Sequence, residues 1–121
     1  MKNPTLKISE NQIKRDIMQI LALRKIPAFR MNSGATPYIE NGKRRFVKFG
    51  FPGCPDIVVL LSDRVGWIEV KTAKGKLSEA QKEFEALCRA RMIPHLVARS
   101  TYDVEEWLDA YNKNTALIGR G

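Results

Sequence analysis

Residues Gly53–Lys71 read GCPDIVVLLSDRVGWIEVK and contain the pair of predicted strands that decides the fold. The apolar runs DIVVLL and WIEVK are separated by the turn-forming run SDRVG. Both runs are typical of buried strands, yet they carry Asp56, Glu69 and Lys71. A charge in a buried sheet is costly unless it is paired or binds something. The fold therefore has to supply a partner for these three side chains.

The alternation of side chains along a strand places Glu69 and Lys71 on one face and Val70 on the other. The short turn predicts that the two strands pair as a hairpin, with Asp56 near the far end of the second strand. The register decides whether Asp56 shares the face of Glu69, because a slip of one residue inverts every side chain. The sequence leaves this open: a turn of even length, or a bulge near Pro55, would bring Asp56 to the Glu69 side.

Two carboxylates that converge repel each other and raise one pKa unless a cation compensates. Lys71 compensates in part, and Mg²⁺ or Mn²⁺ would do so fully, since hard divalent cations bind carboxylate oxygens. Such an ion polarises a phosphoryl oxygen and activates water, while a neighbouring lysine stabilises negative charge. The pattern thus predicts metal-dependent phosphodiester hydrolysis. Glu-x-Lys alone is common and also fits a surface salt bridge. Pro-Asp alone is common at strand starts. The prediction depends on the combination of the two motifs.

The composition favours a single domain with a polyanionic partner. The chain has 121 residues, which we expect to form one domain over residues 1–121, with a core at about 9–112 and a frayed tail at 113–121. A hydrophobic fraction of 44% allows a core without disulfides. The 21 Lys and Arg residues exceed the 13 Asp and Glu, and the net charge of +8 favours nucleic acid as partner. The same balance also keeps a small protein soluble.

The cysteines indicate a reducing compartment and no metal cluster. Two cysteines and one histidine are too few for a structural zinc site, which needs about four ligands. Cys54 and Cys88 are expected to be buried thiols. No apolar run approaches the roughly 20 residues of a membrane span, and MKNPTLKISE lacks the apolar segment of a secretory signal. We expect no zinc, no membrane partner and a cytoplasmic, nucleoid-associated protein.

Capping-box patterns mark the starts of two helices, SENQ from Ser9 and SEAQ from Ser78. Apolar positions at helical spacing extend the first to Pro27 and the second to Pro94. Glu10 lies in the first turn of the first helix, on its apolar side, where a carboxylate also complements the helix dipole.

The remaining segments predict short strands and a last helix. The stretch SGATPYIENGKRR is predicted as a loop, in which Asn-Gly can form a two-residue hairpin turn. The element order α-β-β-β-β-α-β-α predicts an α/β or α+β fold with a mixed sheet. Beyond the central pair, strands are expected at residues 28–32, 46–50 and 95–99, and the helix at 101–112.

Pro55-Asp56 and Glu69-Val70-Lys71 together resemble the PD-(D/E)xK nuclease superfamily. The resemblance extends to the VRR-NUC domain, a virus-type replication-repair nuclease, over about residues 9–100. It is carried by the early SEN, NSG at 32–34, GFPGCPDIVVL from residue 50 and IEVKTAKGKLSEAQ at 68–81. It implies a restriction-endonuclease-like αβββαβ core, in which helices flank a mixed sheet.

The resemblance also implies roles for individual residues. The metal ligands it implies are Asp56, Glu69, Glu10 (directly or through water) and, through its carbonyl, Val70. The catalytic residues it implies are Asp56, Glu69, Gln81 and the catalytic lysine, Lys71. For Gln81, a capping-box role with Ser78 is the alternative.

Basic residues flank the proposed site and, as a set, favour a DNA-facing surface, although each alone is often merely solvated. Asn32 and Ser33 precede a glycine that lets the backbone approach a ligand, and they fit phosphate contacts and a simple turn equally. The DNA-binding residues we expect are Asn32, Ser33, Lys43, Arg44, Arg45, Lys48, Lys74 and Lys76.

The resemblance implies a Mg²⁺- or Mn²⁺-dependent, structure-specific DNA endonuclease from a phage or bacterium. Its substrate would be branched DNA such as four-way (Holliday) junctions or flaps. A restriction-type or nicking nuclease, and a non-catalytic DNA-binding module, are the alternatives. Symmetric cutting of two strands requires a two-fold dimer, so a homodimer is expected. The apolar residues of the last helix fit either its interface or the core; they are Trp107, Leu108 and Tyr111.

Overall fold

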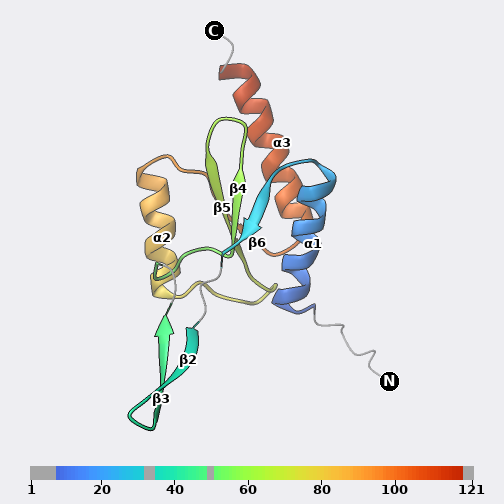
Figure 1. Cartoon of the computed structure of the whole chain (residues 1–121). Helices are drawn as coiled ribbons and strands as arrows, with labels where there is room; N and C mark the ends of the chain where they lie inside the picture. Colours follow the sequence, from blue (N-terminus) through green and yellow to red (C-terminus); the bar gives the residue numbers. More distant parts are fainter. Residues whose placement is uncertain (1–7, 32–34, 49–50, 119–121) are drawn as a thin grey trace, which may run out of the picture.

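The structure, a computed structural model, describes residues 8–31, 35–48 and 51–118 (Figure 1). The bounds of the helices and strands are α1 Glu10–Leu23, β1 Ala28–Arg30, β2 Ala35–Glu40, β3 Lys43–Lys48, β4 Ile57–Leu60, β5 Val65–Val70, α2 Glu79–Ala90, β6 His95–Ala98 and α3 Thr101–Ile118. The element order is α-β-β-β-β-β-α-β-α, which has one strand, β2, more than the sequence predicts.

A mixed sheet with the strand order β1-β4-β5-β6 forms the centre of the body. β1, β4 and β5 are antiparallel neighbours, and β6 joins β5 in parallel after the crossover through α2. A parallel neighbour requires such a crossover, whereas antiparallel neighbours need only a turn. The expected fold class is confirmed: the chain has the helix, three-stranded meander, helix and strand of a restriction-endonuclease-like fold.

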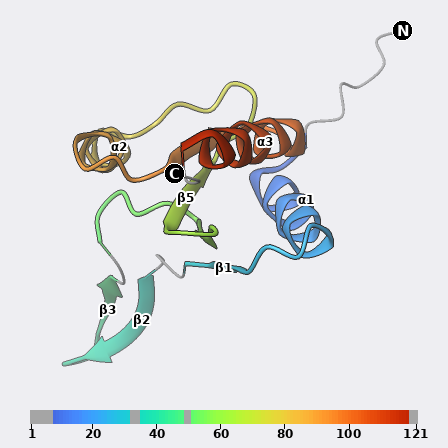
Figure 2. The same cartoon turned by 90° about the horizontal axis from the view of Figure 1, so that it is seen from above.

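The core lies between the sheet and two of the helices. Ile57, Val59, Ile68 and Val70 alternate along β4 and β5 toward one face, where they are buried against side chains from α1 and α3. Figure 2 shows α1 and α3 side by side, with α2 apart from them. α2 packs through Phe84, whose ring meets that of Trp67 edge-on at 5.2 Å between centroids.

The helix starts follow the predicted capping patterns. The Ser9 side chain accepts a hydrogen bond from the backbone N–H of Gln12. Ser78 and Gln81 form a complete capping box, each side chain accepting from the other's backbone N–H. α3 extends to Ile118, beyond the end expected at Asn112. In the part of the chain that the structure describes, no helix combines the length and the apolar character needed to cross a membrane.

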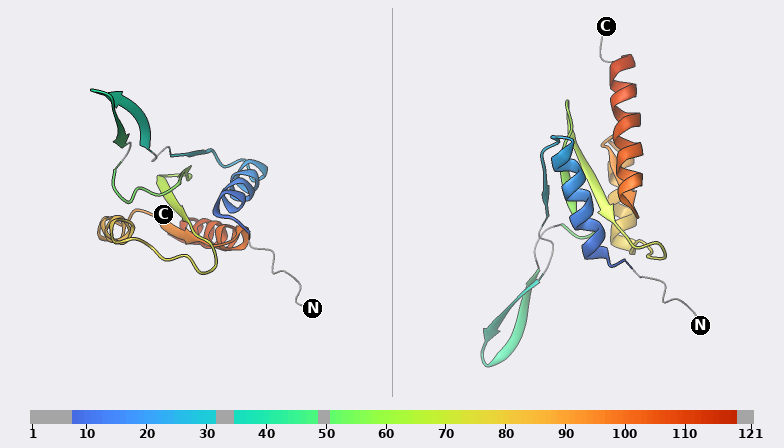
Figure 3. Two further views of the ribbon diagram at one scale, coloured as in Figure 1. Left: turned by 90° about the horizontal axis from the view of Figure 1, so that it is seen from below. Right: turned by 90° about the vertical axis from the view of Figure 1, so that its right-hand side faces the viewer.

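β2 and β3 form a separate two-stranded hairpin, where the sequence predicted mostly loop. That prediction was wrong because Pro37 and the basic run look unlike a buried strand, and this hairpin is not buried. The Asn-Gly turn is confirmed: Asn41 and Gly42 have φ of 52° and 76°, the type I′ geometry that matches strand twist. Among the described residues neither strand contacts another helix or strand, and the hairpin projects from the body (Figures 1 and 3).

Candidate active site

The turn between β4 and β5 fixes the register that the sequence left open. Leu60 pairs with Val65, so the turn contains the four residues 61–64 rather than five. Ile57 pairs with Ile68, and one step further along this register Asp56 stands opposite Glu69. Opposite residues of an antiparallel pair share a face. The even turn therefore brings the two carboxylates together at the end of the sheet.

The Asp56 carboxylate is held by a backbone group and by an ammonium. Its Oδ2 accepts a hydrogen bond of 2.8 Å from the Val70 N–H, and its Oδ1 lies 3.0 Å from Nζ of Lys14. The Asp56 carbonyl in turn accepts from the Met31 N–H at 2.7 Å, which ties the residue to the end of β1. Backbone bonds on both sides thus fix Asp56 on the rigid part of the fold.

Glu69 is a buried charge: only 2% of its surface is exposed. Its Oε1 is fully buried and has no hydrogen-bond partner. Burial, followed by the hydrogen bond and the charge of Asp56, raises the pKa of Glu69 to about 9, with Lys71 opposing in part. Burial also acts to raise the pKa of Asp56, but its contacts with Glu69, Val70 and Lys14 outweigh this and lower it.

These opposite shifts describe two carboxyl groups that share one proton. At neutral pH Glu69 carries the proton and Asp56 stays ionised, because two adjacent buried negative charges are unfavourable. Lys71 follows β5 directly on the Glu69 face, and its ammonium favours the ionised form of Glu69. Its backbone N–H donates to the Ala98 carbonyl at 3.0 Å, which anchors the residue to β6. The structure thus brings together the three residues on which the sequence analysis depends.

Lys14 belongs to this cluster, and the sequence analysis missed it. Its ammonium lies between Asp56 and Glu10, 3.0 and 3.5 Å from their carboxylate oxygens, and only 15% of its side chain is exposed. The i,i+4 spacing from Glu10 was a readable signal for part of this arrangement. The contact with Asp56 joins α1 to the sheet, and no local pattern predicts it.

Glu10 and Gln81 lie nearer the rim of the site. The Glu10 side chain is 42% exposed and pairs with Lys14, and its charge also raises the pKa of Glu69. The Gln81 side-chain oxygen accepts from the Ser78 N–H at 2.8 Å, so that oxygen serves the capping box. The metal role of Glu10 and the catalytic role of Gln81 stay predictions.

The donor set fits a hard divalent cation. Within the described residues, no three His, Cys, Asp or Glu side chains gather as a ligand group. Mg²⁺, however, typically takes one or two carboxylates and keeps several waters. A cation would give the unpartnered Glu69 oxygen a ligand bond. It would also replace the proton shared by the two carboxyl groups, because metal binding displaces protons from its ligands.

The loop after Lys71 is held by a guanidinium. Arg99 donates from Nη1 to the carbonyls of Thr72 at 2.6 Å and Gly75 at 2.7 Å. This loop presents Lys74 and Lys76 to solvent beside the site. Of the other DNA-binding residues we expected, Lys43, Arg44 and Arg45 are exposed on β3, whereas Asn32, Ser33 and the side chain of Lys48 lie outside the described residues.

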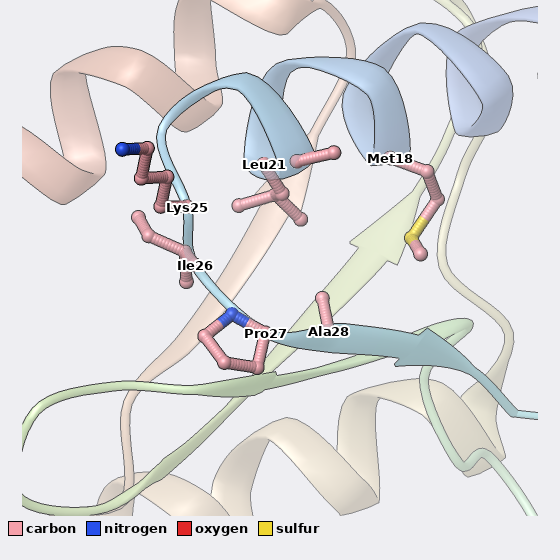
Figure 4. A pocket seen from close by; sticks show the side chains of 7 residues that line it. Met18, Leu21, Lys25, Ile26, Pro27 and Ala28 are labelled. Atoms are coloured by element: carbon pink, nitrogen blue, oxygen red, sulfur yellow. The ribbon is translucent and has the colours of Figure 1, made fainter.

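A cavity of about 340 Å³ lies at the other end of α1, away from the carboxylates (Figure 4). Apart from Lys25 its lining is apolar and offers no carboxylate, so it does not belong to the chemistry of the site. Its lining residues are Met18, Leu21, Ala22, Lys25, Ile26, Pro27 and Ala28.

Comparison with known families agrees with this geometry. The model of the VRR-NUC domain matches residues 8–102, a span that contains the carboxylate pair, Lys14 and Lys71. No curated protein and no solved structure matches the chain. Nucleases of the PD-(D/E)xK type generally use divalent metals, for which the carboxylate pair is suited. The chain therefore belongs to the VRR-NUC domain family and is a nuclease of the PD-(D/E)xK type.

Proposed function

We propose that the protein is a Mg²⁺- or Mn²⁺-dependent endodeoxyribonuclease that cuts branched DNA such as four-way junctions or flaps. The observation that carries the metal dependence is the convergence of Asp56 and the buried Glu69, whose Oε1 has no hydrogen-bond partner. A buried pair of this kind is an unfavourable arrangement for stability alone, because a well-packed apolar pair would serve as well.

Each residue at the end of the sheet has a role in this proposal. The ion would be held by Asp56, Glu69 and the Val70 carbonyl, with Glu10 completing the set. Bound there, it would polarise a phosphoryl oxygen and lower the pKa of a bound water. Lys71 supplies a positive charge beside the scissile phosphate and stabilises the charge that develops there. Gln81 orients the attacking water when its amide turns from the capping box.

Two alternatives remain from the sequence analysis. A restriction-type or nicking nuclease would have the same site, and only its choice of DNA would differ. A non-catalytic binding module has no use for two carboxylates at a phosphate, since like charges repel. The pair of carboxylates, Asp56 and Glu69, therefore favours an enzyme over a non-catalytic binding module.

We also propose a homodimer, because resolving a junction symmetrically requires two sites. The last helix is not a good interface: Leu108 is 1% exposed and Trp107 packs against the core. A better candidate is the sheet face that carries Phe29, Leu60 and Val65, which are 51%, 44% and 41% exposed. The register places all three on the same face. Mass in solution tests this proposal, and a monomer on a cleaved junction would refute it.

Cleavage of labelled DNA tests the proposed activity. A four-way junction, a flap and a linear duplex are incubated with wild-type protein and Mg²⁺, Mn²⁺ or EDTA. We expect cutting of the branched substrates with metal only. Asp56→Asn and Lys71→Ala should abolish cutting, while Lys113→Ala, a control at an exposed lysine of α3 outside the proposed site, should retain it. Preferred cutting of linear duplex would favour the restriction-type alternative, and binding without cutting would favour the module.

A further inference from the structure

We infer that the β2–β3 hairpin is a duplex-binding arm that lies in the major groove of DNA beside the cleavage site. This inference rests on the proposed function. It assigns the hairpin as the surface that positions duplex DNA for the site at the end of the sheet.

The hairpin is built to meet a partner. Its strands have six residues each and span about 20 Å. Within the described chain they contact each other and no other helix or strand. An isolated two-stranded hairpin is only marginally stable in water, and no contact with another helix or strand of the described chain stabilises this one. Its Asn41-Gly42 turn nevertheless has the geometry of a well-formed ribbon.

The charge of the hairpin selects a polyanion as that partner. Residues 35–48 contain four basic residues and one acidic residue. The acidic one, Glu40, stands opposite Lys43 across the strands and is offset by it. A second copy of the chain, with a net charge of +8, offers this ribbon no net complementary charge, so the proposed homodimer would use another surface.

The shape of the hairpin selects duplex over single strand, and one groove over the other. The major groove of undeformed B-DNA is about 12 Å wide and admits a two-stranded ribbon, whereas the minor groove, about 6 Å wide, admits one only when the DNA is bent or the groove is widened. Tyr38 pairs with Arg45, so both lie on the face of Lys43, while the 73% exposed Ile39 lies on the opposite face. Such a ribbon presents cations to phosphates and an apolar side chain to thymine methyl groups.

The chain path keeps the hairpin near the site. The Met31 N–H is bonded to the Asp56 carbonyl, and Ala35 follows only four residues later. Four residues span at most roughly 14 Å. Figure 1 and the right panel of Figure 3 show the hairpin leaving the body at the end where β4 begins and where α1 and α2 begin. Its reach of about 20 Å corresponds to about six base pairs of duplex.

Binding in EDTA tests this inference without any need for cleavage. Lys43→Ala/Arg45→Ala is compared with Arg89→Ala/Arg91→Ala, a control of equal charge on exposed residues at the opposite end of α2. For a 20-base-pair duplex we expect the hairpin variant to lose about tenfold in affinity and about 2 in the slope of log affinity against log salt. The control should change neither, and a single strand should bind both variants alike.

A second substrate tests the groove. In a duplex whose cytosines carry glucosylated 5-hydroxymethyl groups the major groove is filled, so wild type and the hairpin variant should bind equally. An equal loss in both variants on plain duplex, or a persisting difference on the modified duplex, would overturn the inference. If wild-type protein cuts no DNA while the binding difference holds, the proposed function fails and the binding arm stands. If wild-type protein cuts branched DNA while the hairpin variant and the control variant bind alike, the binding arm fails and the proposed function stands.

Discussion

The end of the central sheet and the β2–β3 hairpin both present charged strand residues, but in opposite settings. Glu69 is 2% exposed and lies between a paired aspartate and a lysine. Lys43, Arg44 and Arg45 of β3 are exposed, on a ribbon that, in the described part of the chain, packs against no other element. Buried charges are rigidly placed and have shifted pKa values, whereas exposed ones keep their hydration. The comparison separates a region suited to chemistry from one suited to binding.

The largest effect is expected from Glu69→Gln. Because Glu69 carries a proton at neutral pH without metal, glutamine nearly reproduces its shape and charge. The melting temperature in EDTA should therefore equal that of wild type, while cleavage should fall by about 10³-fold, or about 4 kcal/mol of transition-state stabilisation. Melting curves and cleavage rates measure both. Glu83→Gln, the same change on an exposed part of α2, is the control. Retained cleavage would mean that Glu69 is only structural.

Two glycines with nearly the same positive φ allow the stability of the two regions to be compared. Gly53 and Gly42 have φ of 77° and 76°, but a Cβ at Gly53 would lie 2.1 Å from the Ala80 carbonyl oxygen, whereas one at Gly42 would meet nothing within 4 Å. Both alanine substitutions carry a left-handed strain of about 1–2 kcal/mol.

Gly53→Ala must also push α2 away, so it should destabilise the body by more than about 3 kcal/mol. Gly42→Ala should leave the melting temperature unchanged, since only the hairpin is strained. Denaturant unfolding checks both. Equal losses would show that the hairpin unfolds with the body and that the two regions are not independent.

Much of this division was predictable from the sequence, because it follows from local rules. The helix starts followed from Ser9 and Ser78, and the core strands from their apolar runs. The carboxylate pair was predicted conditionally: the parity of the turn decided it, and parity depends on where Val65 joins β5. A register is a property of two strands, so neither strand's own pattern contains it.

The features that the sequence analysis missed depend on which distant segments contact each other and which do not. Lys14 reaches Asp56 from another element, and no spacing rule connects residues so far apart. The β2 strand was mistaken for loop because its residues lack the apolar alternation of a buried strand, which a projecting hairpin does not need. The roles of Glu10 and Gln81 rest on family resemblance, and they stay predictions.

The proton on Glu69 predicts a pH dependence of stability in EDTA. A carboxyl whose folded pKa of about 9 exceeds its ordinary 4.5 stabilises the fold below 4.5, and this contribution is lost as pH rises through 9. Between pH 7 and 8 the effect is isolated among the shifted groups, since the lowered pKa values of Asp56 and His95 act at lower pH and the raised pKa values of the Cys54 and Cys88 thiols act near pH 9 and above. The melting temperature should fall by several degrees over this window in wild type and stay level in Glu69→Gln. A level wild-type curve would refute the buried proton.

The smallest effect is expected from Lys14, whose ammonium and a metal ion are alternative counter-charges for Asp56. Lys14→Met removes the positive charge 3.0 Å from the Asp56 carboxylate, so Mn²⁺ should bind about threefold more tightly or better. Lys82→Met is the matched control, because its pair with Glu79 is exposed at 59% and 88% and contributes little. Calorimetric titration of both variants with Mn²⁺ in the absence of DNA measures the difference. Weaker binding by Lys14→Met would show instead that the lysine holds Asp56 in its metal-binding position, and the rigidity of the sheet end would then depend on α1 as well as on the strands.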